Sequence, residues 1–137
     1  MTALVVDACA LIAYLFDEEG SDLFESLLLQ ARNHEIQLIM HNINLGEVYY
    51  DILKRNGVTS ARESYRNIRR LPVRFEDRID DPMIYTAGEL KSKWRISYAD
   101  SFAAAQAILL NAELLTTDRK EFEPLKQAGV VRIQWLR

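Results

Sequence analysis

The sequence predicts an α/β domain in which helices cover both faces of a mostly parallel sheet of about five strands. Short apolar runs, typical of strands buried on both faces, alternate along the chain with longer segments of helical periodicity. Parallel strands need crossover connections, and the helical segments lie between these runs. The five glycines and three prolines do not cluster into a linker. Residues 1–137 are therefore predicted to form a single domain with three layers, α/β/α.

Composition sets limits on the function. The 17 basic and 20 acidic residues give a net charge of −3, so any nucleic-acid site must come from a local patch or from bound metal. A single cysteine, Cys9, excludes a disulfide within the chain. No apolar run approaches the length of a membrane span, and the N-terminus lacks the pattern of a secretion signal. We therefore expect a cytoplasmic protein without a membrane anchor.

The N-terminal half contains two buried runs and three helical segments. In order, we predict a strand over Ala3–Val6, a helix from Ala8 to about Asp17, a helix capped by Ser21, a strand over Ile36–Met40 and a helix capped by Asn42 or Asn44. An apolar stripe follows Ser21, as expected for a helix packed on a core. The third helix is predicted to end before Gly57, because glycine commonly follows the last helical residue.

The C-terminal half continues the alternation. We predict a helix from Thr59 or Ser60 to about Arg70, a strand over Val73–Phe75, a helix opened by Asp80 or Asp81, a helix opened by Ser97, a strand at Leu114–Leu115, a helix over Glu121–Gln127 and a strand over Val130–Trp135. Pro72 separates the first helix from the strand that follows it. The helix after Ser97 is rich in alanine, which allows close packing.

Four carboxylates are predicted to meet at one edge of this sheet. Asp7 and Asp118 each follow a buried strand, Asp100 lies in the first turn of its helix, and Glu47 lies about one turn into another. In parallel sheets the carboxyl ends of the strands and the N-termini of the following helices share one edge, and ligands bind there.

A cluster of these acids needs a compensating charge. Two like charges about 4 Å apart repel by on the order of 4 kcal/mol at an effective dielectric constant of about 20. Oxygen-only clusters suit Mg²⁺ or Mn²⁺, which can activate water and hold a phosphate oxygen. Taken singly, each Asp is equally well explained as a turn former or helix cap, and Glu47 as a surface partner of Lys54. Asp51 is better explained as such a surface partner.

Three segments resemble the PIN-domain family, and within it the VapC-type toxin ribonucleases. VVDACALIAYL is similar to the family's opening strand with its first acid, and NLGEVYYDILKRNG to the helix with its second. WRISYADSFAAAQAILLNAELLTTDRKEF is similar to the third-acid helix, the next strand and the Thr-x-Asp turn with its Phe. The resemblance covers nearly the whole chain, and it is the joint order and spacing of the segments that is specific.

The resemblance implies a metal-dependent endoribonuclease, the toxin of a type II toxin–antitoxin pair. It places one or two Mg²⁺ or Mn²⁺ ions on Asp7, Glu47, Asp100 and Asp118, with cleavage by metal-activated water that leaves 5′-phosphate and 3′-hydroxyl ends. Thr116 would orient Asp118 or a water, and Ser97 would either support the site or only cap its helix. A VapB-like antitoxin and a homodimer are also implied. His41-Asn42 departs from the Ser or Thr that relatives often carry there.

Two groups of basic residues are candidates for binding RNA. Arg69 and Arg70 belong to an arginine-rich segment, and Lys91, Lys93 and Arg95 precede the third-acid helix. Solvated helix surface is the simpler explanation of both groups. Trp94 would stack on a base or pack at a helix end. His34 and His41 are predicted to be surface or structural, and Cys9 to be buried.

Two other classes of function are considered. A non-catalytic PIN-like module that binds RNA or protein would keep the fold without turnover, which four intact acids disfavour. A phosphatase acting on small molecules would need a second Asp two residues after its nucleophile, but Asp7 is followed by Ala8 and Cys9. A response-regulator receiver is disfavoured because the chain lacks the adjacent acids near the end of the first strand.

Overall fold

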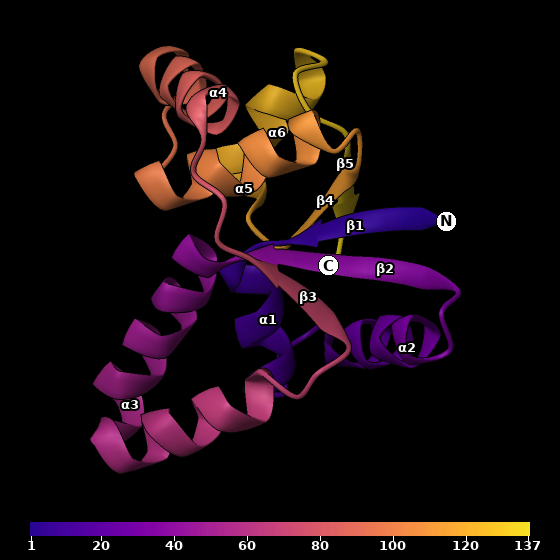
Figure 1. Ribbon diagram of the computed structural model, residues 1–137, viewed down its shortest axis with the longest axis vertical. Helices are drawn as coiled ribbons and strands as arrows, with labels where there is room; N and C mark the ends of the chain where they lie inside the picture. The colour runs from indigo at the N-terminus through magenta and orange to yellow at the C-terminus, as the bar shows by residue number, and fades with distance from the viewer.

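The computed structural model describes residues 1–137 and contains a five-stranded sheet in which all neighbouring strands are parallel. The elements are β1 (Thr2–Val6), α1 (Ala8–Leu15), α2 (Ser21–Arg32), β2 (Ile36–His41), α3 (Asn42–Ile68), β3 (Val73–Glu76), α4 (Asp81–Lys93), α5 (Tyr98–Leu109), β4 (Glu113–Thr116), α6 (Arg119–Gln127) and β5 (Ile133–Trp135). The strand order is β3-β2-β1-β4-β5, and the predicted three-layer α/β/α fold is confirmed (Figure 1). None of the helices is long and apolar enough to cross a membrane.

Each face of the sheet has its own hydrophobic core. Successive residues of β1 point to opposite faces. Leu4 and Val6 pack in one cluster with α1, α2 and α3, whereas Val5 packs in the other with α4, α5 and α6. Figure 1 shows these two groups of helices on opposite sides of the sheet. The alanines at 103–105 of α5 are fully buried, as the alanine-rich sequence predicts.

Two of the predicted helix caps are confirmed, and two short elements differ in their limits. The side chain of Asp80 accepts a hydrogen bond from the backbone of Met83 at 3.2 Å, and Ser97 caps α5. By contrast, α6 begins at Arg119, two residues earlier than predicted, because Asp118 caps it. The last strand is shorter than predicted and begins only at Ile133.

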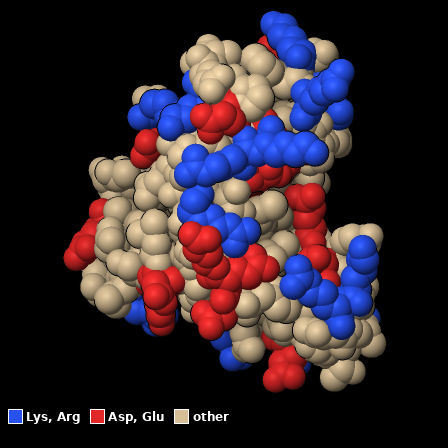
Figure 2. All heavy atoms as spheres, turned by 180° about the vertical axis from the view of Figure 1, so that it is seen from behind, with Lys and Arg blue, Asp and Glu red and all other residues tan.

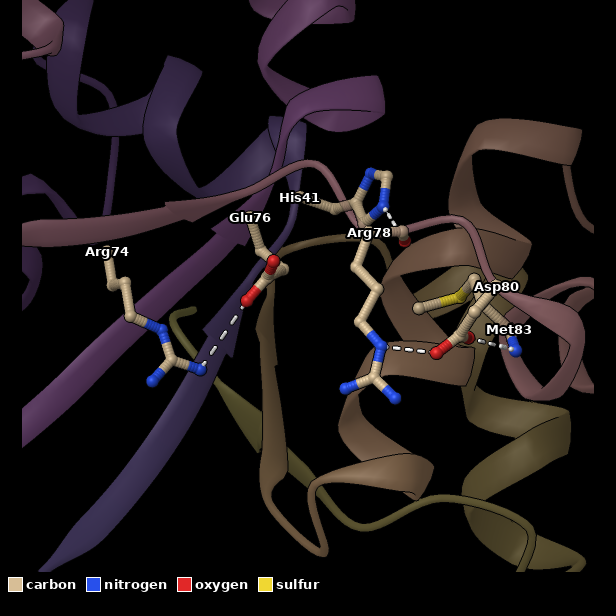
Figure 3. A network of polar contacts seen from close by, with 6 residues as sticks. All are labelled: His41, Arg74, Glu76, Arg78, Asp80 and Met83. Atoms are coloured by element: carbon tan, nitrogen blue, oxygen red, sulfur yellow. Dashed lines mark hydrogen bonds and ion pairs between the residues drawn. The ribbon is translucent and has the colours of Figure 1, made fainter.

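His41 caps α3, so the prediction of Asn42 or Asn44 is wrong. The imidazole Nδ1 accepts a hydrogen bond from the backbone N–H of Ile43 at 3.0 Å. Because Nδ1 is the acceptor, Nε2 carries the proton and donates to the carbonyl oxygen of Arg78 at 3.0 Å (Figure 3). His41 is only 1% exposed. Its role is structural, because it fixes the end of β2 to the connection between β3 and α4.

Gly57 divides α3 into two helical segments. Its backbone has φ 85° and ψ 175°, which is not helical and lies in the region that favours glycine. Figure 1 shows α3 running away from the sheet and then turning back towards β3. The predicted end of one helix before Gly57, and the start of another soon after it, are therefore confirmed.

Gly20, rather than Ser21, precedes α2 as its N-cap, and no side chain caps this helix. Gly20 has φ +98°, and a Cβ added there would lie 2.8 Å from Leu136 Cγ and 2.9 Å from the Leu136 carbonyl oxygen. We therefore expect Gly20→Ala to lower the free energy of unfolding by about 1–3 kcal/mol, measured by urea denaturation. Gly88→Ala is the matched control: it lies within α4, its Cβ would meet nothing within 4 Å, and it should stabilise by about 0.5–1 kcal/mol. Equal effects of the two changes would contradict this account.

Candidate active site

The acidic residues lie at the switch point of the sheet, where the connections from neighbouring strands lead in opposite directions. From β1 the chain moves to β2 and β3 on one side, and it later returns to β4 and β5 on the other. Asp7 directly follows β1, and Asp118 follows the neighbouring strand β4. Each carboxylate caps the next helix: Asp7 Oδ1 accepts from the N–H of Ala10 at 2.9 Å, and Asp118 Oδ1 from that of Glu121 at 3.0 Å. This is the position at which open parallel sheets bind ligands.

Thr116 links these two acids. Its hydroxyl donates a hydrogen bond to Asp7 Oδ2 and accepts one from the backbone N–H of Asp118 at 3.0 Å. Asp7 and Thr116 are both fully buried. The hydroxyl therefore holds the Asp7 carboxylate and the turn after β4 in one arrangement, which supports an orienting role for Thr116.

Asp100 joins the cluster from the opposite helix. Ser97 Oγ accepts from the N–H of Asp100 at 3.0 Å, so the first turn of α5 is well defined. Carboxylate oxygens of Asp100, Asp118 and Glu121 all lie within 4.8 Å of one another. Glu121 was not among the residues predicted from sequence. The Asp-x-x-Glu spacing from Asp118 indicates only the start of a helix, and it does not point to a place for Glu121 in the acidic cluster.

Glu47 approaches the cluster from α3, held by Asn44. Asn44 Nδ2 lies 3.5 Å from Glu47 Oε1 and 3.0 Å from the carbonyl oxygen of Ala99, the residue before Asp100. Asn44 is fully buried. It therefore ties the start of α3 to the start of α5 and sets the distance between two acids of the site.

We expect Asn44→Leu to destabilise the protein by about 1–3 kcal/mol, because it leaves the Ala99 carbonyl without its donor. Thermal unfolding in EDTA measures this change. Asn42→Ala is the control: it removes only a half-exposed contact with Arg69 at 3.5 Å and should change stability by less than about 0.5 kcal/mol. A loss no larger for Asn44→Leu than for Asn42→Ala would show that Asn44 does not join the two helices.

The acids of the site hold protons more tightly than ordinary carboxylates. Burial, with added repulsion from neighbouring acids, raises the pKa of Asp7 from 3.8 to about 7. Burial, the nearby carboxyl group of Glu121 and the charges of the other acids raise the pKa of Asp100 to about 9. Burial also raises the pKa of Glu47. A positive charge placed among these groups would reverse these shifts.

The donor set fits a divalent cation that prefers oxygen. Glu121 Oε2 is buried without a hydrogen-bond partner, a state that costs on the order of 1–3 kcal/mol unless an ion or water is bound. The residues that could hold such an ion are Asp7, Glu47, Asp100, Asp118 and Glu121. All of them offer carboxylate oxygens, as Mg²⁺ and Mn²⁺ require.

Cys9 is half buried and not fully buried as the sequence suggested. Burial and the negative charges of Asp7, Asp100, Asp118 and Glu47 raise the pKa of its thiol. The thiol therefore stays protonated at neutral pH and adds no charged sulfur ligand to the site.

The structure separates the basic residues that the sequence grouped as candidates for RNA binding. Lys93 and Arg95 line a cavity together with Asp118 and Glu121. Lys91 is exposed on α4 outside this cavity, and Arg69 and Arg70 lie at the end of α3, beside the edge strand β3. Figure 2 shows basic side chains extended across the part of the molecule that carries α4 and α6, with acidic side chains beside them.

Fold and site together define a class: a parallel α/β protein with an acidic cluster at the switch point of its sheet. The PIN domain family matches residues 4–126. The chain therefore belongs to the PIN domain family, which is a family of nucleases. None of the curated protein sequences compared with the chain matches it.

Solved structures share the fold across almost the whole chain. VapBC2 from Rickettsia felis, bound to a DNA fragment from its promoter, has a chain with a TM-score of 0.75 and 21% identity, covering 98% of both chains. A chain of a toxin–antitoxin complex from Klebsiella pneumoniae has a TM-score of 0.68 and 19% identity, and the match again covers 98% of both chains. A chain of DNA-bound VapBC from Salmonella typhimurium has a TM-score of 0.76 and 15% identity, and the match covers 100% of both chains. At these identities the likeness establishes the fold.

Proposed function

We propose that residues 1–137 form one nuclease domain that cleaves phosphodiester bonds of RNA with the help of Mg²⁺ or Mn²⁺. The observation that carries the proposal is the convergence of five acids from four segments at the switch point, with Asp118 and Glu121 both at the start of α6. Burial raises the pKa of three of them, and one buried oxygen, Glu121 Oε2, has no partner. Burying several carboxylates together without a compensating charge destabilises the fold, so the arrangement is better explained by binding of a cation than by a structural role.

The chain's own residues would prepare the site. Asp7, Glu47, Asp100, Asp118 and Glu121 would hold the metal. When bound, the metal would polarise a phosphate oxygen and lower the pKa of water. The hydroxyl of Thr116 would keep Asp7 in its orientation, and Ser97 would keep the first turn of α5 in place, so that the acids need not reorganise when substrate binds.

The shared fold supports a role as the toxin of a toxin–antitoxin pair, with a VapB-like antitoxin as partner. The family resemblance also implies a homodimer. On α2, Leu27 and Leu28 are buried in the core, whereas Leu29 is 59% exposed. A group of exposed apolar residues lies on α4 and at the start of α5, where Ile84, Tyr85 and Tyr98 are 49%, 65% and 58% exposed. We propose this surface as the dimer contact; a sedimentation mass equal to one chain would exclude it.

The test is incubation of a total-RNA pool with purified protein and Mg²⁺ or Mn²⁺, beside the same reaction in EDTA. We expect discrete fragments with 5′-phosphate ends that form only with metal. Fragments that form equally in EDTA would exclude a metal-dependent site. Metal binding without any cleavage would favour the alternative of a non-catalytic RNA- or protein-binding module.

A further inference from the structure

A cavity of about 690 Å³ lies directly beside the acidic cluster. One wall is the connection between α4 and α5, which contributes Lys93, Trp94 and Arg95, and the other is the start of α6. Asp118 and Glu121 belong both to this wall and to the acidic cluster. A ligand that fills the cavity would therefore lie beside two acids of the site. Its volume lies within the range of roughly 300–1,000 Å³ that is common for sites of small molecules.

The cations of this cavity are free to bind an anion. Lys93, Arg95 and Lys120 line it, are exposed, and form no ion pair within 4.0 Å. Their neighbour Arg119 is committed elsewhere, since it pairs with Glu123 at 3.9 Å and lies 4.4 Å from the ring centroid of Trp135. Three cations face two carboxylates here, and a metal ion bound to those carboxylates would leave the cavity positive.

Trp94 gives the cavity an aromatic surface. The indole is half buried, packs against the core between α4, α5 and α6, and also lines the cavity. It thus combines the packing role and the exposed face that were alternatives at the level of sequence. A planar aromatic surface beside unpaired cations is the combination that binds single-stranded nucleic acid, in which bases stack and phosphates meet lysine and arginine.

The second basic group is less suited to this role. Arg69 Nη1 lies 3.5 Å from Asn42 Oδ1, and its guanidinium lies 4.9 Å from the ring centroid of Phe75. Neither Arg69 nor Arg70 lines the cavity beside the acids. The observations therefore favour the side of the site formed by α4, α5 and α6.

We propose that this cavity binds the nucleotide next to the scissile phosphate of single-stranded RNA. Lys93, Arg95 and Lys120 contact its phosphates, and Trp94 contacts its base. The inference rests on the proposed nuclease function and adds to it the place of the substrate strand. It predicts that these residues determine affinity for RNA and not the chemical step.

The test is the fluorescence of Trp94 during titration with a short single-stranded RNA in Mg²⁺. Asp7→Asn is included to slow cleavage during the titration, and Trp135→Phe leaves Trp94 as the only tryptophan. We expect RNA to quench the emission. Charge reversal at Lys93, Arg95 or Lys120 should each weaken binding by roughly 3- to 10-fold and lower the slope of log affinity against log salt by about 0.7.

Arg32→Glu is the matched control, because Arg32 is exposed at the end of α2, on the other face of the sheet. It should leave affinity and salt slope unchanged. The inference is overturned if RNA does not quench Trp94, or if the three cavity variants bind as the background protein does. In cleavage by otherwise native protein, the same three variants should raise KM while kcat changes less than about twofold. Absence of cleavage by the native protein would overturn the proposed nuclease function. The quenching titration measures RNA binding alone, so its result does not depend on cleavage.

Discussion

Asp7→Asn and Asp100→Asn should each reduce cleavage of RNA by about 100- to 1,000-fold while the protein stays folded. Asparagine keeps the shape of the side chain, so an amide oxygen in place of Asp7 Oδ1 can still accept a hydrogen bond from the N–H of Ala10. The change removes one negative charge and one anionic ligand from the cluster. The loss should appear in kcat measured with saturating RNA and metal, because the missing ligand acts in the chemical step.

Asp51→Asn is the matched control for these two variants. Asp51 lies one helical turn after Glu47 but pairs with Arg55 at 2.9 Å on the surface of α3, as the sequence suggested. Its substitution should leave kcat within about twofold of the native value. If Asp7→Asn and Asp100→Asn cut RNA as well as Asp51→Asn does, the acidic cluster is not the active site.

The second large effect concerns stability without metal. Asp7 and Asp100 have folded-state pKa values of about 7 and about 9, well above the ordinary value of 3.8. Between these limits the folded protein holds more protons than the unfolded chain, so the free energy of unfolding falls as pH rises. Between about pH 5.5 and 8.5 in EDTA these two pKa values together give a loss of about 6 kcal/mol, seen as a melting temperature lower by roughly 10–20 °C.

Asp100→Asn should remove most of this pH dependence, because asparagine resembles the protonated acid and cannot ionise. At pH 8.5 in EDTA the variant should therefore be more stable than the native protein, although it is nearly inactive. Mg²⁺ or Mn²⁺ should stabilise the native protein most at high pH, where the acids are ionised and bind metal best. A native melting temperature that is flat or rises over this range would contradict the repulsion that we infer in the cluster.

The fold and four of the acids were predictable because their signals are local. A buried parallel strand leaves few positions for a carboxylate that follows it, so Asp7 and Asp118 had to lie at the carboxyl edge of the sheet. Asp100 and Glu47 near the starts of their helices point to the same edge. These signals depend on neighbours in sequence and on the layering of the sheet, and both are set by hydrophobic burial.

The remaining parts of the site depend on contacts between distant segments. Glu121 lies in a highly charged helix and resembles a solvated residue until α5 is packed against it. Asn44 was considered only as a cap, because its bond to the carbonyl of Ala99 joins residues 55 positions apart. His41 displaced the better-known cap residues because Nε2 also reaches Arg78 across the end of the sheet. Such partners are not visible in a local pattern.

The most direct test of the central claim is anomalous diffraction from crystals of the protein soaked with Mn²⁺. The account predicts a peak among the carboxylates of Asp7, Glu47, Asp100, Asp118 and Glu121, with oxygens at about 2.0–2.2 Å, and no such peak in Asp100→Asn. A cluster that stays free of Mn²⁺, or an ion held only at another place on the surface, would contradict the assignment of these acids as the metal site of a nuclease.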